Sequence, residues 1–389
     1  MTTTLWDTTG KKVVEALSAE RRAAGSVSTG LALTLVVVAE EGKVGEAEEA
    51  AKIAAAAHPC RLVIVVRRSY EAEDRLDAEV SVGGRLGPGE AVVMRMYGRL
   101  SLHAESLVLP LLAPDAPVVT WFHTTPPDVI AHDPLGVLAE RRVTDVGRCD
   151  DAVARLRRRA EDYAPGDTDL AWARATSWRG LVASGFDALE ARPRSAVVTA
   201  VEGDAAAELV AGWIAARLSI PVEVAVGGSK GISAITVEVT GPDGSEGRVE
   251  ARRRDSRTAS LSRPGEEERT LPLARRELGE LLAEELKRLD PDEPYADALE
   301  QRFGVEGLEE RDPKRRHVWK DPAEQEAAGE ADVESELVDP VDDVRPTDGE
   351  ATVEATEEGL AQAGEDVGDD GAASDGSATA LADESDEQA

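Results

Sequence analysis

The sequence predicts a two-domain α/β protein with mixed sheets, followed by a disordered acidic tail. Apolar runs of strand length alternate with amphipathic stretches of helix length. The turn-rich segment APGDTD at 164–169 interrupts this alternation. Beyond it, 321–389 holds 24 acidic residues and a single Arg, with too few apolar residues to form a core. We therefore expect a domain with its linking helix over 1–163, a second domain over 170–310, and disorder over 321–389.

The first half reads as buried strands separated by helices. The runs 31–38 and 62–66 are continuously apolar, which is typical of strands buried on both faces. In 92–97, Val92, Met94 and Met96 alternate with their neighbours, which predicts one face in a core. The remaining expectations are helices at 11–24 and 46–57 and strands at 76–82 and 118–122.

The segment after these strands is expected to be helical. The apolar run 102–112 is too short to span a bilayer and predicts a buried helix. Asp133-Pro134 predicts the start of a second helix over 135–142, with arginines at its negative end. A third, amphipathic helix is expected over 151–163.

The second half repeats the predicted order β-α-β-β-β-α. Asp204 is placed to cap the helix that follows the first strand. The expected elements are a helix near 178–189, strands at 196–201, 221–226, 235–239 and 248–254, and a closing helix at 278–289. A duplicated unit is one hypothesis for this repetition, and different strand orders in the two halves would refute it.

Composition excludes several classes of function. The net charge is −33, of which −23 lies in 321–389 and −10 in the rest of the chain. The charge of that rest is ordinary for a soluble surface, and its sign is a weak argument against binding to nucleic acid. There are two cysteines, Cys60 and Cys149, and no CxxC motif, as expected in a reducing compartment. The start of the chain lacks the apolar region of a signal peptide, and no run approaches the length of a membrane span. We expect a cytoplasmic protein that needs no metal and no cofactor.

Two motifs invite a catalytic interpretation. His103 and Ser106 are spaced like a base and a nucleophile, but no GxSxG motif surrounds the serine, which favours a polar patch. The loop GGSKG at 227–231 resembles a phosphate cradle. A strand rather than a helix is expected to follow it, unlike a Walker A loop, so a simple loop is favoured.

Two further groups are candidates for binding. A basic cluster is formed by Arg252, Arg253, Arg254 and Arg257, with Arg252 and Arg254 on one face of an expected strand and Arg253 on the other. The cluster suits an anionic partner or sugar phosphate, the chain's own acidic tail, or a solvated edge strand. Trp121 and Phe122 at a strand end suit either a core or an interface anchor. No dinucleotide fingerprint or carboxylate pair stands out, so the residues by themselves indicate no enzyme.

Three strings in the middle of the chain resemble a known family. GEAVVMRMYGRL, ESLVLPLLAPDAPVVTWF and DPLGVLAERRVTD look like the glucose-6-phosphate dehydrogenase assembly protein family, OpcA, and the start of the chain is similar as well. The resemblance covers roughly 1–310. It departs at Phe122 and His123, where a second Trp and a Pro are expected.

The resemblance implies a non-catalytic partner and allosteric activator of glucose-6-phosphate dehydrogenase. Such a protein would promote the active oligomer of the enzyme and support NADPH supply by the oxidative pentose phosphate pathway. We call residues 91–145, which contain most of these strings, the family-like unit. The partner-binding residues expected in it are Arg95, Tyr97, Trp121, Phe122, Asp133, Arg141 and Arg142. The alternatives are a lactonase-like hydrolase acting on a sugar phosphate of that pathway, and nucleic-acid binding through 248–257.

Overall fold

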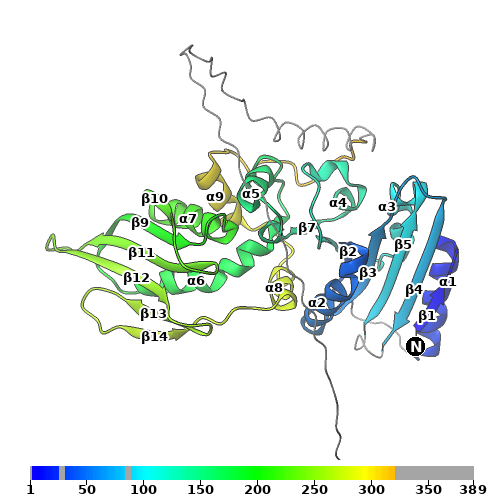
Figure 1. Cartoon of the computed structure of the whole chain (residues 1–389), viewed down its shortest axis with the longest axis horizontal. Helices are drawn as coiled ribbons and strands as arrows, with labels where there is room; N and C mark the ends of the chain where they lie inside the picture. Colours follow the sequence, from blue (N-terminus) through cyan, green and yellow to red (C-terminus); the bar gives the residue numbers. More distant parts are fainter. Residues whose placement is uncertain (1, 26–30, 84–88, 320–389) are drawn as a thin grey trace, which may run out of the picture. The chain divides into compact units, whose positions relative to one another are not determined.

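The computed structural model describes residues 2–25, 31–83 and 89–319 (Figure 1). These residues belong to one compact unit. They form an α/β fold with two mixed sheets, which confirms the predicted fold class. The tail for which disorder is predicted, 321–389, lies outside the described residues.

The first sheet has the order β1-β4-β5-β3-β2-β6-β7-β8. From β5 to β8 neighbouring strands are parallel, whereas β4 is antiparallel to both β1 and β5. The strands are β1 (Thr2–Leu5), β2 (Leu33–Ala39), β3 (Cys60–Arg67), β4 (Arg75–Val82), β5 (Glu90–Tyr97), β6 (Val118–Phe122), β7 (Arg141–Thr144) and β8 (Asp167–Asp169).

Helices cover both faces of this sheet. Helix α1 (Gly10–Ala23) packs on one face and the alanine-rich α2 (Val44–Ala57) on the other (Figure 1). Along β2, Leu35 and Val37 join the core beneath α2, while Val36 and Val38 join the core beneath α1. This alternation is why β2 reads as a continuous apolar run.

Two helix predictions in the family-like unit need correction. The run predicted as a helix over 102–112 is a short helix α3 (Ala104–Val108) followed by a 3-10 turn, Leu109–Leu111, in which Leu109 is exposed. Helix α4 (Pro134–Leu138) begins after its cap Asp133 as predicted but ends early. Arg141 and Arg142 lie on β7 rather than at a helix end, because distant carboxylates pair with both and allow a charged strand to be buried.

The second sheet has the order β10-β9-β11-β12-β13-β14, in which only β9 and β10 are parallel. Its strands are β9 (Arg192–Ala200), β10 (Val222–Val226), β11 (Ile232–Thr240), β12 (Glu246–Arg253), β13 (Thr258–Ser262) and β14 (Arg269–Pro272). Helices α6 (Leu170–Phe186) and α7 (Ala205–Leu218) pack against it. The corresponding strands are β2, β3, β4 and β5 in the first half and β9, β10, β11 and β12 in the second. They lie in the order β4-β5-β3-β2 in the first sheet and β10-β9-β11-β12 in the second. Because the two strand orders differ, the duplication hypothesis is wrong.

Helix α5 (Ala152–Glu161) lies between β7 and β8 of the first sheet in the sequence, and α8 (Leu278–Glu285) and α9 (Glu293–Phe303) follow the second sheet. Strand β8 falls inside the predicted break. Leu281 and Leu282 of α8 belong to the same core cluster as α2 and the first sheet. The core of the first sheet thus includes residues from the second half of the chain, and the domain limits stay a prediction.

Candidate functional site

The carboxyl ends of β2 and β6 are the first place to look for a ligand site. The chain passes from β2 to β3 on one side and later to β6 on the other, and ligands of open α/β sheets bind at such a reversal. Here Arg148 donates to Glu46 Oε2 at 2.9 Å and lies 3.4 Å from His123 Nε2. Glu46 is in the first turn of α2, where a nucleotide phosphate would otherwise approach. Its negative charge disfavours a phosphate at this end of the helix.

The electrostatics of this group follow from burial and from Arg148. The hydrogen bond from Arg148 holds the pKa of Glu46 below its ordinary value. Burial, and then the charge of Arg148, lower the pKa of His123, which favours the neutral imidazole. The ring of Trp121 meets that of His123 edge-on at 5.0 Å between centroids. Trp121 is fully buried, so the indole belongs to the core in this structure.

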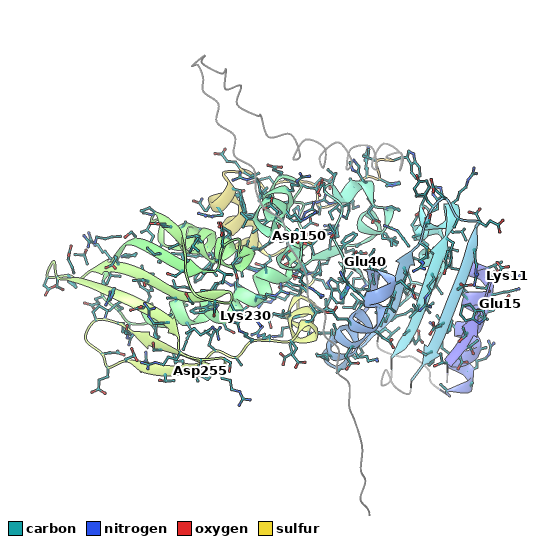
Figure 2. All side chains as sticks on the ribbon, in the orientation of Figure 1. Lys11, Glu15, Glu40, Asp150, Lys230 and Asp255 are labelled. Atoms are coloured by element: carbon teal, nitrogen blue, oxygen red, sulfur yellow. The ribbon has the colours of Figure 1, made fainter. Side chains whose placement is uncertain are left out.

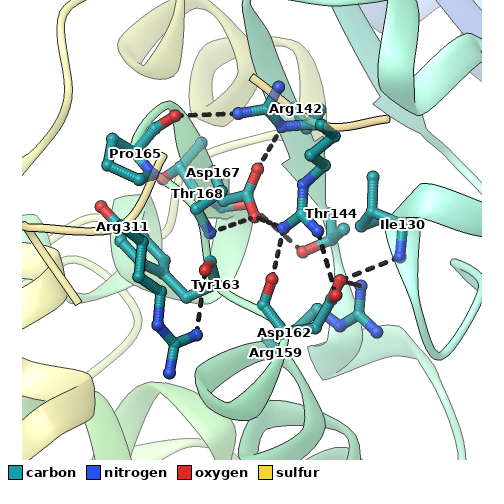
Figure 3. A network of polar contacts seen from close by, with 12 residues as sticks. Ile130, Arg142, Thr144, Arg159, Asp162, Tyr163, Pro165, Asp167, Thr168 and Arg311 are labelled. Atoms are coloured by element: carbon teal, nitrogen blue, oxygen red, sulfur yellow. Dashed lines mark hydrogen bonds and ion pairs between the residues drawn. The ribbon is translucent and has the colours of Figure 1, made fainter. Parts of the chain in front are cut away.

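Arg142 is the centre of a buried polar network (Figure 3). Its guanidinium pairs with Asp167 and donates to the carbonyl oxygens of Ala139 at 2.8 Å and Pro165 at 2.9 Å. Asp167 also pairs with Arg315, which is bound in turn to Asp162 at 2.9 Å. The network ties β7 and β8 to α5 and to the segment after α9.

Arg141, Asp133 and Phe122 are also buried and engaged inside the molecule. Arg141 donates to Glu285 Oε2 at 2.8 Å, and Arg67 binds both oxygens of Asp133 at 2.6 and 2.8 Å. Burial opposes ionisation of Asp133, but Arg67 outweighs it and the pKa lies below the ordinary value. Phe122 packs in the core beneath α1. Five of the seven predicted partner-binding residues therefore have buried side chains.

Arg95 and Tyr97, at the end of β5, are the two that reach the surface. Arg95 donates to Glu41 at 2.9 Å and to Glu79 at 2.7 Å. The ring of Tyr97 lies between two guanidinium groups, with centroid distances of 5.7 Å to Arg68 and 5.6 Å to Arg75.

Trp6 directly follows β1, which pairs with β4, and the sequence patterns did not single it out. It is 67% exposed, and the backbone N–H of its neighbour Asp7 donates to Asp77 Oδ1 at 2.9 Å. Asp77 also pairs with Arg75 at 2.8 Å, which places Trp6 beside the same strand. We call Trp6, Arg68, Arg75, Arg95 and Tyr97 the Tyr97 surface. The sequence signal that could have indicated Trp6 as a surface residue is a single tryptophan among the polar residues of the segment 2–12.

The arginines of the second sheet do not act as one cluster. Arg252 pairs with Glu250 and Arg254 with Glu268, and both are exposed. The backbone N–H of Arg257 donates to Asp255 at 2.7 Å in the turn before β13. Their assignment to an anionic partner or to the tail stays a prediction.

The two catalytic motifs are not brought together. His103 stacks on Trp319 at 5.5 Å, and Ser106 donates its hydroxyl proton to the carbonyl of His103. Lys230 and Gly231 of the GGSKG loop instead line a cavity of about 360 Å³ beside α6. Within the described residues no group of three or more His, Cys, Asp or Glu is placed to hold a metal ion. Nor does any helix of the described part have the length and apolarity needed to cross a membrane.

The fold and these contacts define a class: a two-sheet α/β protein whose prominent charged residues are paired internally. A family model described as the glucose-6-phosphate dehydrogenase subunit N-terminal domain matches residues 51–161, and one for the C-terminal domain matches 165–299. The chain belongs to the OpcA glucose-6-phosphate dehydrogenase assembly family, which confirms the resemblance found in the sequence.

Comparisons outside the family add little. No curated protein matches the chain. Among solved structures, KijD10, a 3-ketoreductase from Actinomadura kijaniata, has 11% identity and a TM-score of 0.34, covering 74% of this chain and 100% of that one. An NAD-binding oxidoreductase from Klebsiella pneumoniae has 10% identity and a TM-score of 0.37, covering 71% and 95%. Likeness at this level carries no conclusion about activity.

Proposed function

We propose that this chain is a non-catalytic partner of glucose-6-phosphate dehydrogenase that promotes the enzyme's active oligomer in the cytoplasm. Through that enzyme it would support NADPH supply by the oxidative pentose phosphate pathway. Family membership supports the association with the enzyme. One observation carries the non-catalytic role: the charged residues of the family-like unit, such as Arg141 and Arg142, are committed to buried ion pairs.

The mechanism that we propose is thermodynamic linkage. A partner that binds the active oligomer more tightly than the separate subunits shifts the equilibrium toward the oligomer. The size of the shift is set by that difference in affinity alone. No group of this chain needs to enter the active site of the enzyme.

We assign the direct contact to the Tyr97 surface. Tyr97, with the guanidinium groups of Arg68 and Arg75 near its ring, and the exposed Trp6 offer aromatic area of the kind that anchors many protein interfaces. The buried residues among the seven predicted partner-binding residues support this surface from inside the protein. Asp133, for example, binds Arg67, which immediately precedes Arg68 at the end of β3.

The experiment uses the full chain and purified glucose-6-phosphate dehydrogenase. Activity and molecular size of the enzyme are measured with and without the chain, and we expect the chain to increase both. If neither changes at micromolar concentrations of both proteins, the proposed function is wrong. Turnover of 6-phosphogluconolactone by the chain alone would instead favour the hydrolase alternative.

A variant tests the assigned surface. Trp6→Ala combined with Tyr97→Ala should weaken binding to the enzyme at least tenfold, about 1.4 kcal/mol, because both side chains are anchors in this proposal. Val226→Ala is the matched control, since Val226 is 73% exposed on the second sheet. Equal binding by the double variant and the control would contradict the assignment while leaving the partnership itself intact.

A further inference from the structure

A cavity in the second half of the chain gathers positive charge from separate segments. Its volume is about 360 Å³, and it is bordered by α6, the first turn of α7, the GGSKG loop, the end of β12 and the segment 273–276. Figure 2 marks Lys230 in that loop. The cationic lining residues are Arg174, Lys230, Arg253, Arg275 and Arg276. The lining contains one carboxylate, that of Asp204.

Among the residues that the structure describes, two of these five cations have a carboxylate partner. Arg174 binds Asp145 through both guanidinium nitrogens, and Arg276 lies 3.5 Å from Glu284. The Oδ1 of Asp204 accepts the N–H of Ala207 at 2.8 Å and caps α7, so this carboxylate contributes one negative charge to a lining with five cations.

The other three cations have no carboxylate within ion-pair distance among the described residues. Arg253 donates to the carbonyl oxygen of Leu273 at 2.9 Å, and Arg275 to that of Lys230 at 2.8 Å. The Nε of Arg253 is buried and has no acceptor in the described part of the chain. Burial, and then the nearby charge of Arg275, lower the pKa of Arg253. Like charges facing one cavity cost free energy that a bound anion would recover.

The shape and lining select the kind of anion. Three cations with several N–H donors suit the three oxygens and double charge of a phosphate better than a single carboxylate. Ala206, in the first turn of the 14-residue helix α7, also lines the cavity, but the Asp204 carboxylate caps this end of the helix, so the anion is assigned to the side-chain cations. Trp178 contributes an aromatic wall, with the guanidinium of Arg253 5.4 Å from its ring. The volume lies in the range of small-molecule sites.

We propose that this cavity binds a phosphorylated small molecule, with the phosphate held by Lys230, Arg253 and Arg275 and the rest of the ligand against Trp178. The site is independent of the Tyr97 surface. It would give the chain a ligand of its own, whether or not it binds glucose-6-phosphate dehydrogenase.

Calorimetric titration of the full chain tests the proposal with three probes: glucose 6-phosphate, inorganic phosphate and glucose. We expect binding of the two phosphate-containing probes and none of glucose. Equal affinity for both would identify the phosphate alone as the recognised group, and tighter binding of glucose 6-phosphate would add a contribution from the sugar. No binding of either phosphate probe, or equal binding of glucose, would overturn the proposal.

Variants identify the site. Lys230 and Arg275 are exposed, so Lys230→Ala combined with Arg275→Ala should leave the unfolding temperature nearly unchanged and weaken phosphate binding at least tenfold. Lys12→Ala combined with Arg22→Ala is the matched control, because it removes one lysine and one arginine from exposed positions on α1, outside the cavity lining. Equal weakening by both pairs would indicate only non-specific attraction and would overturn the assignment.

Discussion

Arg141 on β7 donates to Glu285 Oε2 at 2.8 Å, although the two residues are 144 positions apart in the chain. Their side chains are 3% and 4% exposed. Thr168 Oγ1 donates to the same carboxylate oxygen at 2.8 Å. The pair joins the first sheet to the end of α8, and so it joins the two halves of the sequence.

Arg141→Ala should destabilise the protein by about 3–5 kcal/mol, because it leaves the carboxylate of Glu285 buried without its counter-charge. Replacing both residues, by Arg141→Met with Glu285→Leu, should recover most of the loss. Arg217→Ala is the control, since Arg217 and Asp297 form an exposed pair at 3.3 Å that should contribute at most about 1 kcal/mol. Urea unfolding gives the free energy of unfolding of Arg141→Ala, of the double replacement and of Arg217→Ala. A loss from Arg141→Ala no larger than that of the control would contradict the structural role.

Gly212→Ala should destabilise the protein by about 1–3 kcal/mol, because a Cβ at this position of α7 would lie 2.0 Å from the carbonyl oxygen of Ala298 on α9. Gly180→Ala is the matched control on α6, where a Cβ meets nothing within 4 Å. There the better helix propensity of alanine should stabilise by about 0.5–1 kcal/mol. Thermal unfolding of both variants checks the prediction. Shifts of the same sign would show that α7 and α9 do not pack this closely.

Stability should fall in acid because of Glu90, which lies between Arg21 and Arg61. Burial would raise its pKa, but the hydrogen bonds from both arginines outweigh burial and hold the pKa below 4.5. A depressed pKa in the folded state means that this contribution is complete above the unfolded pKa and is lost as the pH falls through the folded value.

Glu90→Gln should therefore lower the free energy of unfolding at pH 7 and make it less dependent on pH below 4.5. The control is Glu246→Gln, whose partner Arg194 lies 2.9 Å away and whose own side chain is 75% exposed. Urea unfolding between about pH 3 and 7 gives both curves. An unchanged acid slope in Glu90→Gln would exclude Glu90 as a source of the acid sensitivity.

How far the sequence predicts this structure depends on how local the interactions are. The apolar runs of β2 and β3, and the helix caps Asp133 and Asp204, are set within a few residues and were predicted correctly. Strand β7 was missed because the carboxylates of Asp167 and Glu285, which allow its arginines to be buried, are 25 and 144 residues away.

The same reasoning applies to the candidate sites. The tyrosine of the Tyr97 surface belongs to a recognisable string, but its cationic neighbours come from the ends of β3 and β4. In the phosphate cavity, Lys230 lies in a motif that the sequence did reveal. Arg253 and Arg275 join it only through the fold, because the pairing of β12, β13 and β14 brings their segments together.

His123 offers a prediction in which two variants shift one pKa in opposite directions. The charge of Arg148 lowers the pKa of His123, and the charge of Glu46 raises it. Arg148→Met should therefore raise the pKa of His123 toward 6.5, and Glu46→Gln should lower it further below that value. NMR titration of the imidazole signals of His123 measures both shifts. Shifts of the same direction in both variants would mean that Arg148 and Glu46 do not act on His123 with opposite charges, and would contradict the arrangement of these three side chains.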